Sequence, residues 1–198
     1  RTGGIDTVDF LAPGVLALAV MSTAMVSLGI ATGFERQYGV LKRLATTPLG
    51  RPALLTAKTT AVLAVEVVQV AVLGLAALLM GWHPYGDVIV VTATVLLATV
   101  AFAGLGLLMA GTLKAEVTLA AANGLYLVLL LLGGMVVPLS RLPGPLEGVA
   151  RALPAAALSD ALRATLGTGA AVPGRAWIVL AVWAVAAPTA AAFTFRWE

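Results

Sequence analysis

The sequence predicts an all-α fold, a polytopic bundle of transmembrane helices, and three observations support this prediction. Hydrophobic residues make up 61% of the 198 residues, and only 11% are charged, whereas a soluble domain has about 25% charged residues. Mean hydropathy is +1.03. The apolar residues fall into long uninterrupted runs, unlike the alternating strands of a membrane barrel. A soluble globule is excluded because too few polar side chains are present to cover its surface.

Five runs are long enough to cross a hydrocarbon core of about 30 Å, which takes about 20 apolar residues in a helix. We predict spans over residues 10–34, 53–80, 88–113, 117–138 and 176–195. All of them are expected to belong to a single transmembrane domain, residues 1–198.

The segments between the spans differ in character. Residues 35–52 are rich in charge and end in proline and glycine, while residues 139–175 are long and interrupted by prolines. The latter pattern, with leucines spaced beside charges, predicts short amphipathic helices that re-enter the outer leaflet before the last span. Because basic residues gather on the cytoplasmic side of membranes, the cluster in residues 35–52 orients that segment toward the cytoplasm, and residues 139–175 toward the outside.

Most site chemistry is excluded by composition. The chain has no cysteine, a single histidine (His83) and a net charge of +3 without a basic run. These features argue against a metal site, a disulfide framework and a nucleic-acid partner. No glycine-rich phosphate-binding loop is present. We therefore expect no enzyme activity and no cofactor in this chain.

One carboxylate, Glu66, falls midway along the second predicted span, with Gln69 three residues later. An acid at bilayer depth is costly and is a functional candidate by default. Two interpretations remain open: contact with a substrate, proton or ion along a transport pathway, or a protonated or hydrogen-bonded packing residue.

Small residues inside the spans allow helices to approach closely. Gly29 and Gly33 form a GxxxG pattern, and Gly104, Gly106 and Gly111 form a second series. Packing within the chain is favoured over a dimer seam.

The charged segment contains a specific pattern. Leu41, Leu44 and Ala45 fall at helical spacing, with Lys42 and Arg43 on other faces. The spacing predicts a short amphipathic helix at the membrane interface that ends near Pro48.

This segment resembles the membrane subunits of type-2 ABC exporters, especially those of drug-resistance and antibiotic-export systems. The matching residues are Glu35, Arg36, Gly39, Leu41, Lys42, Arg43, Leu44, Thr47 and Pro48. Residues 9–14, 135–146 and 160–163 continue the resemblance in the same order. Such permeases have six spans, so the resemblance implies one further span before the first predicted here.

The resemblance implies that residues 35–48 form a coupling helix that docks on a separate ATP-binding subunit, where ATP and Mg²⁺ are held. It also implies a second permease copy, a homodimer being favoured, a surrounding lipid bilayer and a bacterial plasma membrane. The expected cargo is a hydrophobic or amphipathic drug, antibiotic or lipid that leaves the cell. The alternative is a stand-alone secondary carrier that uses Glu66 for ion coupling, or a structural membrane subunit that transports nothing.

Overall fold

The computed structural model describes residues 7–40, 43, 51–135 and 143–195. Within these residues the chain is all-helical and contains no strand. Helices long and apolar enough to cross a membrane cover Leu11–Gln37, Thr56–Leu79, Val88–Thr112, Ala115–Leu132 and Gly174–Thr194. The predicted fold class, a polytopic helical bundle, is confirmed.

The first spanning helix is continuous but not uniform. It consists of α1 (Thr7–Met21), a π-helical segment η1 (Ser22–Ser27) and α2 (Leu28–Gln37). The residues at both junctions, Met21 and Leu28, keep right-handed helical backbone angles. A π segment inserts extra backbone into a helical turn, which changes the direction of the side chains that follow it. From Thr7 to Gln37, the helix is longer at both ends than the predicted span over residues 10–34.

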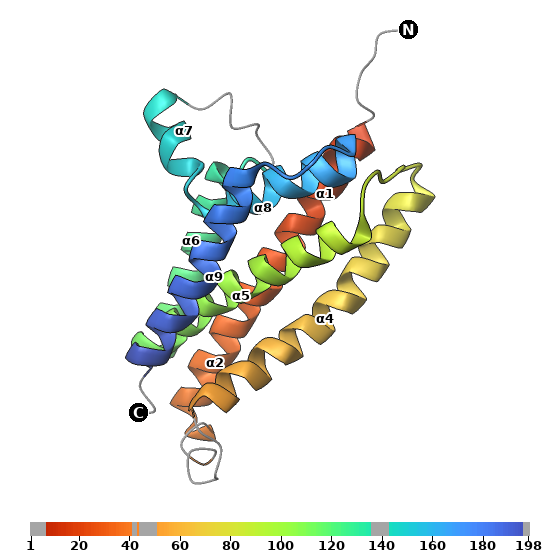
Figure 1. Ribbon diagram of the computed structural model, residues 1–198. Coiled ribbons are helices and arrows are strands. Elements are labelled where there is room, and N and C mark those ends of the chain that lie inside the picture. The colour runs from red at the N-terminus through yellow and green to blue at the C-terminus, as the bar shows by residue number, and fades with distance from the viewer. Residues whose placement is uncertain (1–6, 41–42, 44–50, 136–142, 196–198) are drawn as a thin grey trace, which may run out of the picture.

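α5 (Val88–Thr112) lies at the centre of the bundle and packs along α9 (Gly174–Thr194) and against α2. Asp87 begins α5 by accepting a hydrogen bond from the Ile89 N–H at 2.7 Å, which satisfies one of the unpaired donors of a helix start. Figure 1 shows α5 crossing the bundle between α4 and α9.

Glycines allow α5 to approach both of its main neighbours. A Cβ atom on Gly104 would lie 2.5 Å from the backbone N of Pro188 in α9, and one on Gly106 would lie 2.6 Å from the Met25 carbonyl oxygen. Gly29 faces Gly106 in turn, and Gly33 faces Thr118. Both glycine series therefore serve packing within the chain, as the sequence analysis favoured.

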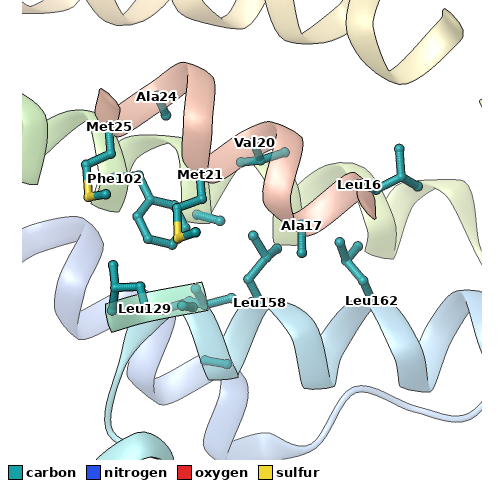
Figure 2. Close-up of a cluster of buried hydrophobic side chains, with 14 of the residues drawn as sticks. Leu16, Ala17, Val20, Met21, Ala24, Met25, Phe102, Leu129, Leu158 and Leu162 are labelled. Carbon is teal, nitrogen blue, oxygen red and sulfur yellow. The ribbon is translucent and has the colours of Figure 1, made fainter. Parts of the chain in front are cut away.

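The hydrophobic core forms where the first spanning helix meets α5, α6 and α8. Figure 2 shows this cluster, which combines residues from four separate parts of the chain. Its labelled members are Leu16, Ala17, Val20, Met21, Ala24, Met25, Phe102, Leu129, Leu158 and Leu162.

α4 (Arg51–Leu79) lies at the edge of the bundle, beside α1 and α5 (Figure 1). Its outward residues, including Val67, Val68, Val72 and Leu75, are 60–71% exposed. Such apolar exposure is ordinary for a helix that faces lipid.

The fourth span differs from the prediction. α6 covers Ala115–Leu132, and Gly133–Met135 follow in a bend, so the helix ends six residues before the predicted limit at 138. Gly134 has a φ of +68°, a backbone conformation that glycine adopts without the steric cost of a side chain. Hydropathy remains high through this bend, which is why the pattern alone extended the span.

The outer segment contains the short helices that the sequence predicts. They are α7 (Gly144–Ala150), α8 (Pro154–Leu162) and a π-helical segment η3 (Arg163–Gly167). α8 is buried against α1, α5 and α9. These elements lie at the end of the bundle where α1 begins, and α2 ends at the opposite end (Figure 1).

Candidate functional site

The last turn of α2 carries three consecutive polar residues, Glu35, Arg36 and Gln37, at the predicted cytoplasmic end of the first span. Glu35 forms an ion pair with Lys58 of α4. The Lys58 side chain is only 14% exposed, so this pair is shielded from solvent more than an ordinary surface salt bridge. The sequence analysis placed Glu35 and Arg36 on a separate coupling helix, whereas the structure places them on the spanning helix itself.

Arg36 and Gln37 contact two further helices. The Arg36 guanidinium donates a hydrogen bond to the carbonyl oxygen of Leu113, the residue that ends α5. Carbonyls at a helix end lack intrahelical donors and carry partial negative charge, so a guanidinium is a suitable partner. Gln37 Nε2 donates to Glu116 Oε1 of α6 at 2.8 Å.

Together these contacts form a set that we call the α2 anchor: Glu35, Arg36, Gln37, Lys58, Leu113 and Glu116. It joins the end of the first span to α4, α5 and α6. Beside it lies a polar hollow of about 310 Å³ between α2 and α6, lined by Gly33, Arg36, Gln37, Lys114, Ala115 and Glu116.

α2 ends at Gln37, and the turn that follows contains Gly39. The Gly39 N–H donates to the Arg36 carbonyl at 3.0 Å, and Gly39 has a φ of +72°. A left-handed residue directly after a helix, most often glycine, is a common way to end it. Val40 and Arg43 are again helical, and the Arg43 N–H donates to the Gly39 carbonyl at 3.2 Å.

Arg43 is exposed. Four other residues of the predicted coupling helix, Leu41, Lys42, Leu44 and Pro48, lie outside the described residues. The amphipathic helix and its docking role therefore stay predictions. The structure adds that the segment begins directly from the α2 anchor.

The two intramembrane candidates, Glu66 and Gln69, lie on α4 and contact different helices. Glu66 is 2% exposed, and its Oε2 accepts a hydrogen bond from the Thr99 hydroxyl of α5. Gln69 Oε1 accepts one from the Thr23 hydroxyl of η1 at 2.8 Å. The structure thus brings each of them to a neighbouring span and does not bring the two together at one point.

The second carboxylate oxygen of Glu66, Oε1, has no hydrogen-bond partner among the described residues. A buried polar atom without a partner is rare and calls for an explanation. The Thr99 hydroxyl accounts for Oε2, whereas the described residues supply no donor for Oε1.

Sequence reasoning missed the partners of these groups: Thr23, Thr99, Lys58 and Glu116. A signal for the threonines existed, because hydroxyl side chains in transmembrane helices commonly bond across helices. The Thr99 hydroxyl also bonds its own helix, at the Val95 carbonyl oxygen 2.9 Å away.

A second charged cluster lies at the opposite end of the bundle. Arg163 Nη2 donates to the Met135 carbonyl at 2.7 Å and so holds the start of η3 against the bend after α6. Burial raises the pKa of Asp160 above its ordinary value, although Arg151 and Arg163 act in the opposite direction. Burial likewise lowers the pKa of Arg163. This cluster fastens the outer helices to the spans.

Comparison with known proteins agrees with this architecture. Residues 1–166 match the model of a membrane-domain family described as ABC-2 type transporter. No curated protein and no solved structure matches the chain significantly. Members of this family are multi-pass permeases that generally work with an ABC ATP-binding subunit. Since the match covers most of the 198 residues, the chain belongs to the ABC-2 type transporter family.

Proposed function

We propose that this permease, residues 1–198 as one domain, is the membrane subunit of an ATP-driven exporter in a bacterial plasma membrane. Two copies of the chain, identical in the simplest case, would work with two ATP-binding subunits that hold ATP and Mg²⁺. The cargo would be a hydrophobic or amphipathic compound such as a drug, antibiotic or lipid.

The observation that carries the proposal is the α2 anchor and its position directly before residues 38–50. Glu35, Arg36 and Gln37 connect the end of the first span to α4, α5 and α6. A displacement of the following segment by a nucleotide-dependent partner would therefore reach four spans at once. A partner can shift the permease between two states only through contacts that differ between those states, and the α2 anchor would pass such a shift on to the spans.

Apolar hollows along α4 support the assignment of the cargo. One hollow of about 250 Å³ lies between α1 and α4, and another of about 290 Å³ lies between α4 and α5. Small-molecule sites are mostly apolar with a few polar groups. Both hollows are lined mostly by apolar atoms, and the hollow between α4 and α5 also has the polar residues Glu66 and Thr92.

The test is purification of the tagged full-length protein from its native membrane in mild detergent, followed by native mass spectrometry. The charge reversal Arg43→Glu changes an exposed residue of the predicted docking segment. Arg36 is left intact because its guanidinium holds Leu113. Arg175→Glu, an exposed arginine at the start of α9, is the matched control at the other end of the bundle.

We expect a complex of two permease copies and two P-loop ATPases from the wild type and from Arg175→Glu. Arg43→Glu should weaken the association by about tenfold or more, as loss of a close interfacial charge pair does. Substrate transport that persists in a preparation without any bound ATPase would contradict the proposal, and would favour a stand-alone carrier that uses Glu66.

A further inference from the structure

The hollow between α4 and α5 combines an apolar wall with one buried carboxylate. Its volume is about 290 Å³, which suits a single ring system or the end of a chain rather than a large molecule. The apolar wall is formed mainly by Leu63, Val67, Val70, Val91, Val95 and Leu96. Among the described residues that line it, Glu66 is the only charged one.

The carboxylate is only half satisfied. Thr99 donates to Oε2, and Oε1 has no hydrogen-bond partner among the described residues. No basic side chain lines the hollow. Lys58, eight residues earlier on α4, is about 12 Å away along the helix axis, and it is paired with Glu35. An ionised Glu66 therefore has no counter-charge within the described lining of the hollow.

The hollow is reachable from the membrane. Val67 is 71% exposed and Leu96 is 43% exposed, so the wall opens on the outer surface of the bundle, where α4 and α5 lie side by side (Figure 1). A molecule dissolved in the bilayer can enter without crossing the core.

We propose that this hollow binds an amphipathic organic cation, with its apolar body against α4 and α5 and its ammonium group bonded to the Glu66 carboxylate, whose buried Oε1 becomes accessible when the side chain rotates toward the hollow. An ammonium group supplies both the missing donor and the missing counter-charge, which a neutral or anionic amphiphile lacks. Charge-assisted hydrogen bonds are about twice as strong as neutral ones. A metal ion is a poor alternative, because within the described residues no group of three or more His, Cys, Asp or Glu side chains gathers.

This proposal rests on the proposed function and deepens it, since it names the class of cargo that the exporter would take from the membrane. Two probes separate charge from hydrophobicity: 1-naphthylmethylamine, which is cationic at neutral pH, and 1-naphthylmethanol, its neutral analogue. Binding is measured by calorimetry with the purified full-length protein in lipid nanodiscs, and empty nanodiscs correct for partitioning into lipid.

Three variants locate the site. Glu66→Gln removes the charge and keeps the shape. Ala71→Leu adds bulk at an exposed alanine that lines the hollow and leaves the carboxylate in the sequence. Ala76→Leu is the matched control, because Ala76 is an exposed alanine of the same helix that lines the separate hollow between α1 and α4.

We expect the amine to bind the wild type and Ala76→Leu with equal affinity. The amine should bind Glu66→Gln at least about tenfold more weakly than the wild type, because a buried charge pair is lost. It should also bind Ala71→Leu at least about tenfold more weakly, because the larger side chain occupies part of the hollow. The alcohol should bind wild type and Glu66→Gln equally weakly. Ala71→Leu keeps the proposal testable if Glu66→Gln does not fold.

Equal affinity for amine and alcohol, or amine binding that Glu66→Gln leaves unchanged, would overturn the cation site. Absence of binding by either probe would also overturn it, as expected if a second copy of the chain covers the hollow. Amine binding by a permease that associates with no ATPase would keep the site and refute the exporter. A complex with an ATPase that binds no amine would support the exporter and refute the cation site.

Discussion

α5 and α4 are both long apolar helices, yet they are held in the bundle by different means. In the most apolar stretch of each, 39% of α5 is buried within the protein but only 11% of α4. α5 is rich in small residues that bring its backbone against α9 and the first span. α4 bonds to its neighbours through side chains that include Lys58, Glu66 and Gln69.

This difference in attachment indicates which of the two helices is easier to displace. Lipid is as apolar as the side chains, so helices associate in membranes through close packing and interhelical hydrogen bonds. Displacing α5 would open voids along two backbone contacts, which is costly. Displacing α4 breaks a few hydrogen bonds beside hollows that already exist. We therefore infer that α4 is the span that moves most easily relative to the rest.

The largest expected effect tests the close packing of α5. Gly106→Val should destabilise the protein by about 3 kcal/mol or more, because its Cβ would collide with the Met25 carbonyl and overpacked cores relax poorly. The measurement is thermal unfolding of the purified protein in detergent.

Gly74→Ala on α4 is the control, since nothing lies within 4 Å of its added Cβ. It should stabilise the helix by about 0.5–1 kcal/mol. Equal effects at the two glycines would remove the contrast between the helices.

A smaller effect is expected at the α2 anchor. Arg36→Gln shortens the side chain and leaves the Leu113 carbonyl without its guanidinium donor, which should cost about 1–3 kcal/mol. Arg36→Lys should recover part of this loss, because an ammonium keeps the charge near the helix end. Unfolding temperature is measured together with substrate-stimulated ATP hydrolysis of the assembled complex. Unchanged stability with both variants would show that the anchor does not hold α2.

The smallest effects should come from the polar contacts of α4. Thr23→Val removes one interhelical hydrogen bond, worth about 0.6 kcal/mol on average in membrane proteins. Thr99→Val removes the described donor to the buried Glu66 carboxylate, and its cost should lie near the upper end of such bonds, about 1.7 kcal/mol. The double variant should broaden the distribution of distances between spin labels on α4 and α5, which pulsed electron paramagnetic resonance measures. The absence of native cysteine makes paired labelling direct. Thr112→Val, whose hydroxyl bonds only its own helix among the described contacts, is the control. Unaltered distances in the double variant would show that packing alone holds α4.

Much of the fold could be predicted from the sequence, and the exceptions have local causes. The fold class and the five spans are confirmed. They could be predicted because a span is a run of consecutive apolar residues, which the sequence shows directly. The end of α6 was wrong by six residues, since hydropathy does not register the bend that Gly134 permits. The π segments η1 and η3 have no signal in the apolar pattern, because they depend on how neighbouring helices pack.

For the candidate site, the sequence marked the right residue types and could not assign their partners. Glu66 was identified from its cost at bilayer depth, while Thr99, 33 residues away, was not. Likewise, Arg36 was assigned to docking on another subunit, although its guanidinium holds a carbonyl 77 residues away. Its role toward an ATP-binding subunit stays a prediction.

The sequence by itself determined that this protein is a multi-pass helical permease, because hydropathy, helix length and motif order are properties of neighbouring residues. Only the tertiary structure decided which spans touch closely, which carboxylate oxygen lacks a partner, and which helix lies at the edge. These depend on residues 30 to 80 positions apart that the packing of small side chains brings together.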